Sequence, residues 1–169
     1  TLSHSSAASD VYKRQYFTFK HISLLKEYGF NRISLGIQDF RDEVLNAINR
    51  KPSKLKIEDI IGKIKDEGFT GTNIDLVYGL PLQTVESFNE TVDRAIKLGT
   101  DRIVTFSYAH VPSVISRQKV LDKIGFPSAD EKAKMYQNAY DKFIAAGYIA
   151  IGMDPVSYTH LTLPTSVTV

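Results

Sequence analysis

The sequence predicts an α/β fold in which parallel strands alternate with helices, in about four helix–strand units. Four predicted helices each end at a glycine, and a predicted strand begins a few residues later; these glycines are Gly29, Gly68, Gly99 and Gly147. Strands separated by helices of this length cannot be hairpin partners, so they pair in parallel through right-handed crossovers. The array fits either a doubly wound sheet or part of a (β/α) barrel.

Composition narrows the class of protein. The chain has 169 residues, of which 43% are hydrophobic, enough for one ordinary domain with a core. Its 21 basic and 19 acidic residues are interspersed, so no basic patch predicts nucleic-acid binding. We see neither a bilayer-spanning apolar stretch nor a secretory signal, and expect a cytoplasmic protein without a membrane partner. The chain has no cysteine, so it cannot by itself hold a disulfide, a thiolate metal site or an iron–sulfur cluster.

The two ends of the sequence differ from the part between them. Residues 1–15 are rich in Ser and Ala, and residues 155–169 are rich in Thr and Ser with Pro155 and Pro164 as breakers. Both ends resemble translated adapter or vector sequence, and we expect them to lie outside the fold. The predicted domain is therefore residues 16–154.

The first half of this domain contains three predicted helices and one strand. Residues 19–28 form a helix with apolar residues on one face. An alternating strand follows over residues 32–38, and Asp39 is predicted to cap a short helix. The next helix carries the i, i+3, i+4, i+7 stripe of an amphipathic helix, which is Ile57, Ile60, Ile61 and Ile64.

The second half repeats the helix–strand alternation. A buried strand is predicted within residues 73–81. Thr84 is predicted to cap the helix that leads to a third strand over residues 102–110. The last helix opens with a capping box at residues 128–131 and is followed by a strand over residues 149–153.

Asp75 stands in the middle of the second strand. An unpaired carboxylate in a dry site is very costly, so Asp75 either pairs with a basic residue or points toward a ligand. No GxGxxG or GxxxxGK[ST] sequence follows any predicted strand, which removes the usual phosphate-binding signals of open α/β sheets.

Residue parity predicts one small and polar face across the three strands. This face carries Ser34, Gly36, Gln38, Asn73, Asp75, Val77, Thr105, Ser107 and Ala109, whereas the apolar alternates, among them Val104, Phe106 and Tyr108, should pack on the helices. Enzyme barrels normally fill their interior with Val, Ile and Leu, so a polar interior implies a lumen wide enough for a ligand. We hypothesise that Gln38, Asp75 and Ala109 face this lumen near the carboxyl ends of the strands.

Four segments resemble, in order and spacing, the oxygen-independent coproporphyrinogen III oxidases, a family of radical S-adenosylmethionine (SAM) enzymes. They are GFNRISLGIQDF (29–40), NIDLVYGLPLQTVESF (73–88), DRIVTFSYAHVP (101–112) and GYIAIGMD (147–154). The resemblance covers residues 16–154 and implies a central fragment of a partial, six-stranded (β/α) barrel.

The resemblance also implies an activity for the parent protein. In this family a 4Fe–4S cluster on three cysteines cleaves SAM, and two propionates of coproporphyrinogen III are oxidatively decarboxylated to vinyl groups in haem biosynthesis. The product is protoporphyrinogen IX, and two SAM molecules are bound. Positions that contact SAM in the family fall on Gln38, Arg50, Asp75 and Ala109. The parent is expected to be a monomer that acts on this small molecule.

The residue types agree with SAM binding. Arg50 can bind a carboxylate through two N–H groups, Asp75 can accept from ribose hydroxyls or an ammonium, and Gln38 can both donate and accept. Arg50 would also keep Asp75 ionised. We predict no catalytic or metal-binding residue, because His110 and Tyr108 at the strand end are interpreted as packing or hydrogen-bonding residues.

The chain departs from the family pattern in its cluster motif. It lacks CxxxCxxC and the Gly-Gly-Gly-Thr-Pro strand, and Pro155 stands where the family has His-Phe. We therefore expect this polypeptide alone to be inactive, whatever the activity of its parent. Two alternatives stay open: a radical SAM-like haem carrier, and an unrelated βα-barrel binding module.

Overall fold

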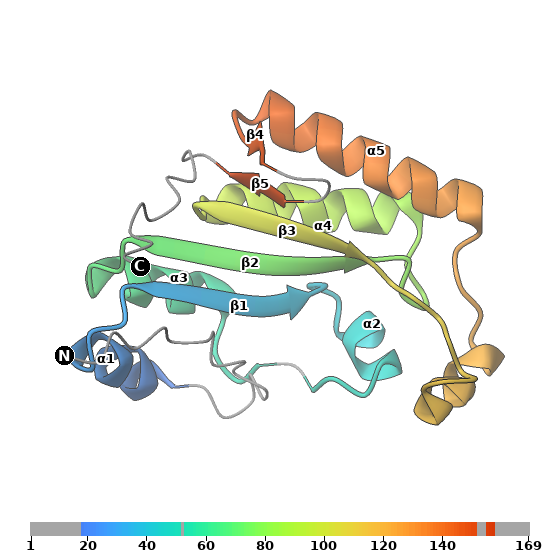
Figure 1. Ribbon diagram of the computed structural model, residues 1–169, viewed down its shortest axis with the longest axis horizontal. Helices are drawn as coiled ribbons and strands as arrows, with labels where there is room; N and C mark the ends of the chain where they lie inside the picture. The colour runs from blue at the N-terminus through green and yellow to red at the C-terminus, as the bar shows by residue number, and fades with distance from the viewer. Residues whose placement is uncertain (1–17, 52, 152–154, 158–169) are drawn as a thin grey trace, which may run out of the picture.

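The fold is built on a sheet of five strands in the order β1-β2-β3-β5-β4. A computed structural model describes residues 18–51, 53–151 and 155–157. Figure 1 shows the elements, which in chain order are α1 (Phe19–Glu27), β1 (Arg32–Gln38), α2 (Asp42–Ala47), α3 (Ile57–Asp66), β2 (Gly71–Tyr78), α4 (Val85–Leu98), β3 (Arg102–Ser107), the 3₁₀ helix η2 (Ser116–Lys123), α5 (Ala129–Ala145), β4 (Ile149–Ala150) and β5 (Pro155–Ser157). None of the helices in the described ranges is long and apolar enough to cross a membrane.

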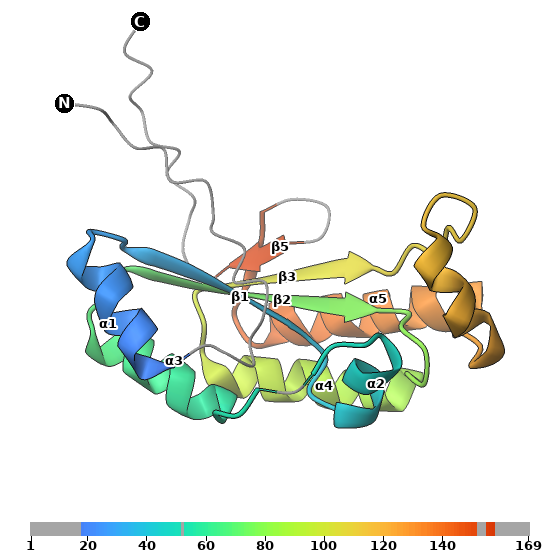
Figure 2. The ribbon, with the colours of Figure 1, turned by 90° about the horizontal axis from the view of Figure 1, so that it is seen from below.

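The three long strands pair in parallel, which confirms the predicted α/β class. Gly36 of β1 lies opposite Asp75 of β2, and Asp75 lies opposite Val104 of β3. In Figure 2, α1, α3 and α4 lie on one side of these strands. The opposite side, which carries Gly36, Asn73, Asp75 and Val104, has no described helix over it and is called the open face below.

The helix side of the sheet forms the hydrophobic core. Ile74 and Leu76 of β2 have no exposed surface, whereas Asp75 between them is half-buried on the open face. Their partners are apolar side chains at helical spacing on three helices, namely Ile57, Ile60, Ile61 and Ile64 of α3, Phe88, Val92 and Ala95 of α4, and Met135, Ala139 and Phe143 of α5. Alternate residues of each strand therefore face either this core or the open face.

Two of the three predicted helix caps are confirmed. The hydroxyls of Thr84 and Ser128 each accept a hydrogen bond from the backbone N–H three residues later, at the start of α4 and α5. The predicted cap at Asp39 is wrong, because α2 starts after Arg41. The Asp39 carboxylate is buried and points toward β2 and α4 instead.

The parity predicted for the third strand is also wrong. Thr105, expected on the ligand side, lies opposite Leu76 and is only 4% exposed on the helix side. Val104 and Phe106 take the open face, where Phe106 is 48% exposed. Pairing with β2 sets this register, and it overrides the preference of Val and Phe for the helix side. The strand also ends at Ser107 rather than His110.

The last predicted strand is not parallel to the others. Of its described residues, 149–151, only Ile149–Ala150 form a strand, β4, which pairs antiparallel with β5. β5 pairs antiparallel with β3 as well. So short a connection between β4 and β5 permits only antiparallel pairing, because a parallel pair needs a crossover of a dozen or more residues.

The described sheet extends past the expected domain end at residue 154. Pro155–Ser157, which the sequence assigns to the C-terminal tail, supplies β5. The rest of the two predicted tails, residues 1–15 and 158–169, lies outside the described residues.

We expect substitutions on the two faces of β2 to differ in their effect on stability. Ile74→Ala removes a fully buried side chain and should lower the free energy of unfolding by about 2–5 kcal/mol. Val77→Ala, on the half-buried open face, should cost about 1 kcal/mol. Urea unfolding of this chain would measure both, and equal losses would contradict the assignment of faces.

Candidate functional site

The side chains of Gln38 and Arg50 converge over Gly36 on the open face. A β-carbon placed on Gly36 would lie 2.9 Å from Gln38 Nε2 and 3.0 Å from Arg50 Nη2. Gly36 is also the β1 residue opposite Asp75. An amide, a guanidinium and a carboxylate therefore meet where β1 has no side chain of its own.

The end of helix α2 places Arg50. Asn49 follows the C-cap of α2 with φ of +56°, and its backbone N–H donates to the Asn46 carbonyl. The Arg50 N–H donates to the Leu45 carbonyl at 2.8 Å, which completes a Schellman motif. The guanidinium then returns to β1, where Nη2 donates to the Gly36 carbonyl at 3.0 Å. Asn suits this turn because it tolerates a left-handed backbone better than most residues.

A tight turn at the end of β1 places Gln38. Its φ is +68°, and the N–H of Asp39 donates to the Ile37 carbonyl at 2.9 Å across it. This is a γ-turn with a left-handed central residue, a rare and strained form. The regular pairing with β2 is interrupted between Gly36 and Gln38. The interruption leaves the Gln38 side chain directed back over Gly36.

Polar neighbours on the open face hold the Asp75 carboxylate. Asn73 Nδ2 donates to Asp75 Oδ1 at 2.8 Å, and the Ser34 hydroxyl lies 3.4 Å from Asp75 Oδ2. Asn73 Nδ2 also donates to Ser34 Oγ at 2.7 Å. Asn73 Oδ1 is buried without a hydrogen-bond partner in the described part of the chain. The network fixes the carboxylate and leaves one buried acceptor beside it.

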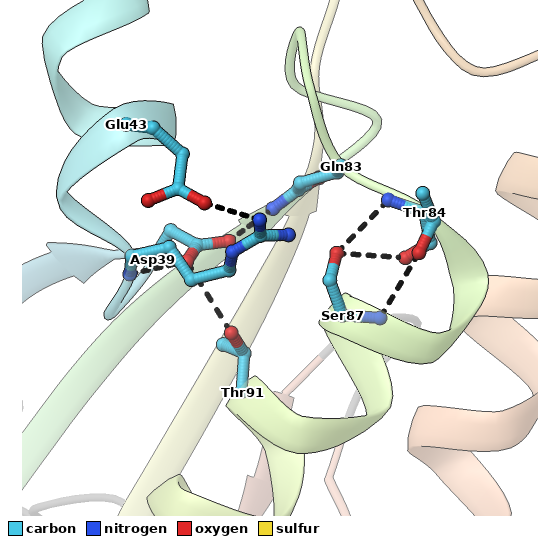
Figure 3. Close-up of polar contacts among 7 residues, drawn as sticks. Asp39, Glu43, Gln83, Thr84, Ser87 and Thr91 are labelled. Carbon is cyan, nitrogen blue, oxygen red and sulfur yellow. Dashed lines mark hydrogen bonds and ion pairs between the residues drawn. The ribbon is translucent and has the colours of Figure 1, made fainter.

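Behind the site, Asp39 and Gln83 form a buried polar cluster that links the ends of β1 and β2. Gln83 Nε2 donates to Asp39 Oδ2 at 2.6 Å and to the Val77 carbonyl at 2.9 Å, and Gln83 Oε1 accepts from the Leu80 N–H at 2.9 Å. Figure 3 shows Thr91 of α4 against the same carboxylate, at 3.4 Å. Burial raises the pKa of the Asp39 carboxyl above its ordinary value, and its hydrogen bonds offset part of that effect.

Ala109, the fourth predicted site residue, stands apart from the Gly36 cluster. It lies beyond the end of β3 and is exposed. Gln118 of η2 holds this segment, because its Nε2 donates to the Ala109 carbonyl at 3.0 Å and its Oε1 accepts from the Val111 N–H at 2.6 Å. The structure thus brings together Gln38, Arg50 and Asp75, and it places Ala109 past the carboxyl end of the sheet.

The open face also carries apolar side chains. Val104 lies opposite Asp75 in the register and Phe106 lies opposite Val77. Apolar surface beside a few placed polar groups is typical of small-molecule sites. Among the residues that the structure describes, no three His, Asp or Glu side chains gather as a metal site.

Several supporting residues escaped the prediction. Asn73 and Ser34 were expected on the ligand side but were given no role, and Gln83 and Asp39 were not expected to meet. The available signal was the Gln within the GLPLQT sequence after β2, since a buried amide at a strand exit needs polar partners. Their meeting depends on how β1 and β2 lie in the sheet, which the sequence alone does not specify.

Comparison with known protein families identifies the superfamily to which the chain is related. Residues 13–95 match the family model of the radical SAM superfamily. The chain is 43% identical over 130 residues to an oxygen-independent coproporphyrinogen III oxidase of Salmonella typhimurium, which covers 77% of this chain and 28% of that protein. The enzyme of the same name from Pseudomonas aeruginosa is 41% identical over 143 residues, covering 85% of this chain and 30% of that protein.

Solved structures agree with these sequence matches. The coproporphyrinogen III oxidase of Escherichia coli, a radical SAM enzyme, superposes with a TM-score of 0.81 at 36% identity, covering 86% of this chain and 33% of that one. An archaeal Elp3 from Methanocaldococcus infernus, at 19% identity and a TM-score of 0.60, shares the fold alone.

The chain spans less than a third of the length of the curated relatives described above. Its sequence matches one region of those enzymes, and its fold matches one region of the Escherichia coli structure. The chain accordingly belongs to the radical SAM superfamily and is homologous to one segment of the oxygen-independent coproporphyrinogen III oxidases.

Proposed function

We propose that this chain is a SAM-binding segment of a cytoplasmic oxygen-independent coproporphyrinogen III oxidase. The whole protein would convert two propionates of coproporphyrinogen III to vinyl groups in haem biosynthesis. The relatives that support this proposal carry that name and are 41–43% identical to this chain. The relatives named here are oxidases, which favours the enzyme over a haem carrier.

The convergence of Gln38, Arg50 and Asp75 around Gly36 is the observation that carries the proposal. SAM presents a carboxylate, an ammonium, a ribose diol and a sulfonium. The Arg50 guanidinium suits the carboxylate, and the Asp75 carboxylate suits the ribose hydroxyls or the ammonium. The Gln38 amide can serve either partner, and Val104 and Phe106 add apolar surface for the purine.

The cluster of the parent enzyme would be held outside this chain, which contains no cysteine. With the cluster in place, SAM would supply the deoxyadenosyl group that removes a hydrogen atom from the substrate. The residues described above would bind and orient the nucleoside and do no proton transfer themselves. Their site would be one of the two SAM sites that we propose for the parent.

We expect Arg50→Ala and Asp75→Asn each to weaken SAM binding in the full-length protein that contains this segment. Each change removes hydrogen bonds to a charged group, a loss of about 1.5–3 kcal/mol. The dissociation constant should rise by about 10- to 150-fold. Isothermal titration with SAM measures the change.

Arg94→Ala and Asp93→Asn are matched controls for these variants. Arg94 pairs with Glu58 and Asp93 pairs with Lys142, both at exposed positions among the helices. Both controls should keep the parent affinity for SAM. If Arg50→Ala and Asp75→Asn bind SAM as the controls do, the proposed site is wrong.

A second prediction concerns the space above Gly36. Gly36→Ala would place a methyl group against Gln38 Nε2 and Arg50 Nη2, so both side chains must move. Because the tips of flexible side chains move cheaply, stability should change by less than about 1 kcal/mol. SAM affinity should fall by about tenfold, which corresponds to one charge-assisted hydrogen bond.

Gly62→Ala provides the comparison for this variant. Gly62 lies inside α3, and a β-carbon there would meet nothing within 4 Å. The Gly62→Ala variant should stabilise the helix by about 0.5–1 kcal/mol and leave SAM affinity unchanged. Equal SAM affinity in the two variants would show that the space over Gly36 is not part of the site.

A further inference from the structure

We propose that Asp39 and Gln83 are positioning residues that hold the Gln38 amide in its binding geometry. This inference rests on the proposed SAM site and assigns it a supporting pair. Neither side chain lies on the open face: both are buried between β1, β2 and α4. They would act on the ligand only through Gln38 and, to a lesser extent, through Arg50.

The conformation of Gln38 needs such support. A non-glycine residue with φ near +68° costs energy and persists only where its surroundings determine it. The γ-turn hydrogen bond from Asp39 N–H to the Ile37 carbonyl spans Gln38, so the position of Asp39 sets the direction of the Gln38 side chain. If Asp39 lost its hydrogen bond to Gln83, the turn could open, and the Gln38 backbone would relax to the extended conformation of an ordinary strand end.

The anchor of Asp39 is Gln83. One N–H of the Gln83 carboxamide donates to the Val77 carbonyl, and its Oε1 accepts from the Leu80 N–H, both on the backbone where the chain leaves β2. The second N–H donates to Asp39. The amide is therefore orientated by the backbone before it meets the carboxylate. With only 5% of its surface exposed, Gln83 has little contact with water that could replace these bonds.

Asp39 connects the same anchor to Arg50. Its Oδ1 accepts from the N–H of Arg41, the N-cap residue of α2, at 2.8 Å. The far end of that six-residue helix is the Schellman motif that delivers Arg50. One buried carboxylate thus fixes both the turn that carries Gln38 and the helix that carries Arg50.

Filling the space between β1 and α4 would not by itself require a carboxylate, and taking this group out of water is costly. An apolar residue of similar size would fill that space, but it would leave the Gln83 amide and the Arg41 N–H without this acceptor. The carboxylate can accept from the amide, the Arg41 N–H and the Thr91 hydroxyl together, which an apolar side chain cannot do. The carboxylate therefore fixes the directions of three neighbouring groups at once, which is the property that a positioning residue needs.

The test is a double-mutant cycle for SAM affinity in the full-length protein. The variants are Gln83→Ala, Gln38→Ala and the two together, with unfolding by urea measured in parallel. Gln83→Ala should raise the dissociation constant of SAM by about tenfold, a common effect of losing the partner that orients a binding residue. In the Gln38→Ala background, Gln83→Ala should add less than about threefold, because the residue on which it acts is gone.

Two further variants keep the test decisive. Asp39→Asn keeps the size of the side chain but sets one NH₂ group against the Gln83 amide, so it serves if Gln83→Ala does not fold. It should weaken SAM binding and lose that effect in the Gln38→Ala background. Ile64→Val, in the core at α3, provides a loss of stability remote from the site and should leave SAM affinity unchanged.

Two results would overturn the inference. One is a loss of SAM affinity by Gln83→Ala that is the same with and without Gln38. The other is unchanged affinity in Gln83→Ala and Asp39→Asn despite lower stability, which is the behaviour of a structural pair. Neither result contradicts the proposed function, provided that Arg50→Ala and Asp75→Asn still weaken SAM binding. Unchanged SAM affinity in those two variants would instead contradict the SAM site itself.

Discussion

The structure depends on the two-residue period of strand β2. Ile74 and Leu76 must be buried against the helices, and a strand turns successive side chains to opposite faces. Asp75 between them is therefore turned to the open face. A shift of one residue in register would bury the carboxylate and expose both apolar side chains. The burial of Ile74 and Leu76 therefore also determines the orientation of Asp75.

Around that carboxylate, the site combines rigid and strained parts. Asn73 and Ser34 come from regular strand positions and hold Asp75 by direct contacts. Gln38 and Arg50 come from the end of β1 and the end of α2, each next to or within a left-handed backbone turn. Strained backbone persists only where surrounding contacts determine it, and here the contacts are the buried bonds of Asp39 and the Schellman bonds of α2.

The placement of the polar groups also accounts for Gly36. A side chain at this position would compete with Gln38 and Arg50 for the space beside Asp75. Binding residues held by neighbours in the folded protein lose little freedom when a ligand arrives, which favours affinity. If the proposed SAM site is correct, the open face is in this respect prepared for its ligand before binding.

Much of the fold could be predicted from local sequence. The isoleucine stripe of α3, the caps of α4 and α5 and the alternation within β1 and β2 follow from side-chain spacing. Prediction failed in β3, where Thr105 faces the core and Phe106 the open face. There the strand follows the register set by β2, and burial of one hydroxyl is a smaller cost than the loss of sheet pairing.

The helix–strand order, the helix-facing side of β1 and β2 and the outward direction of Asp75 could all be inferred from the sequence, because they depend on the period of a helix or a strand. The folded chain was needed to show that Asp39 meets Gln83, that Gln38 and Arg50 share the space over Gly36, and that the last strands run antiparallel. These features join residues far apart in the chain or adjust short segments to their neighbours. The spacing of side chains along the sequence does not predict such contacts.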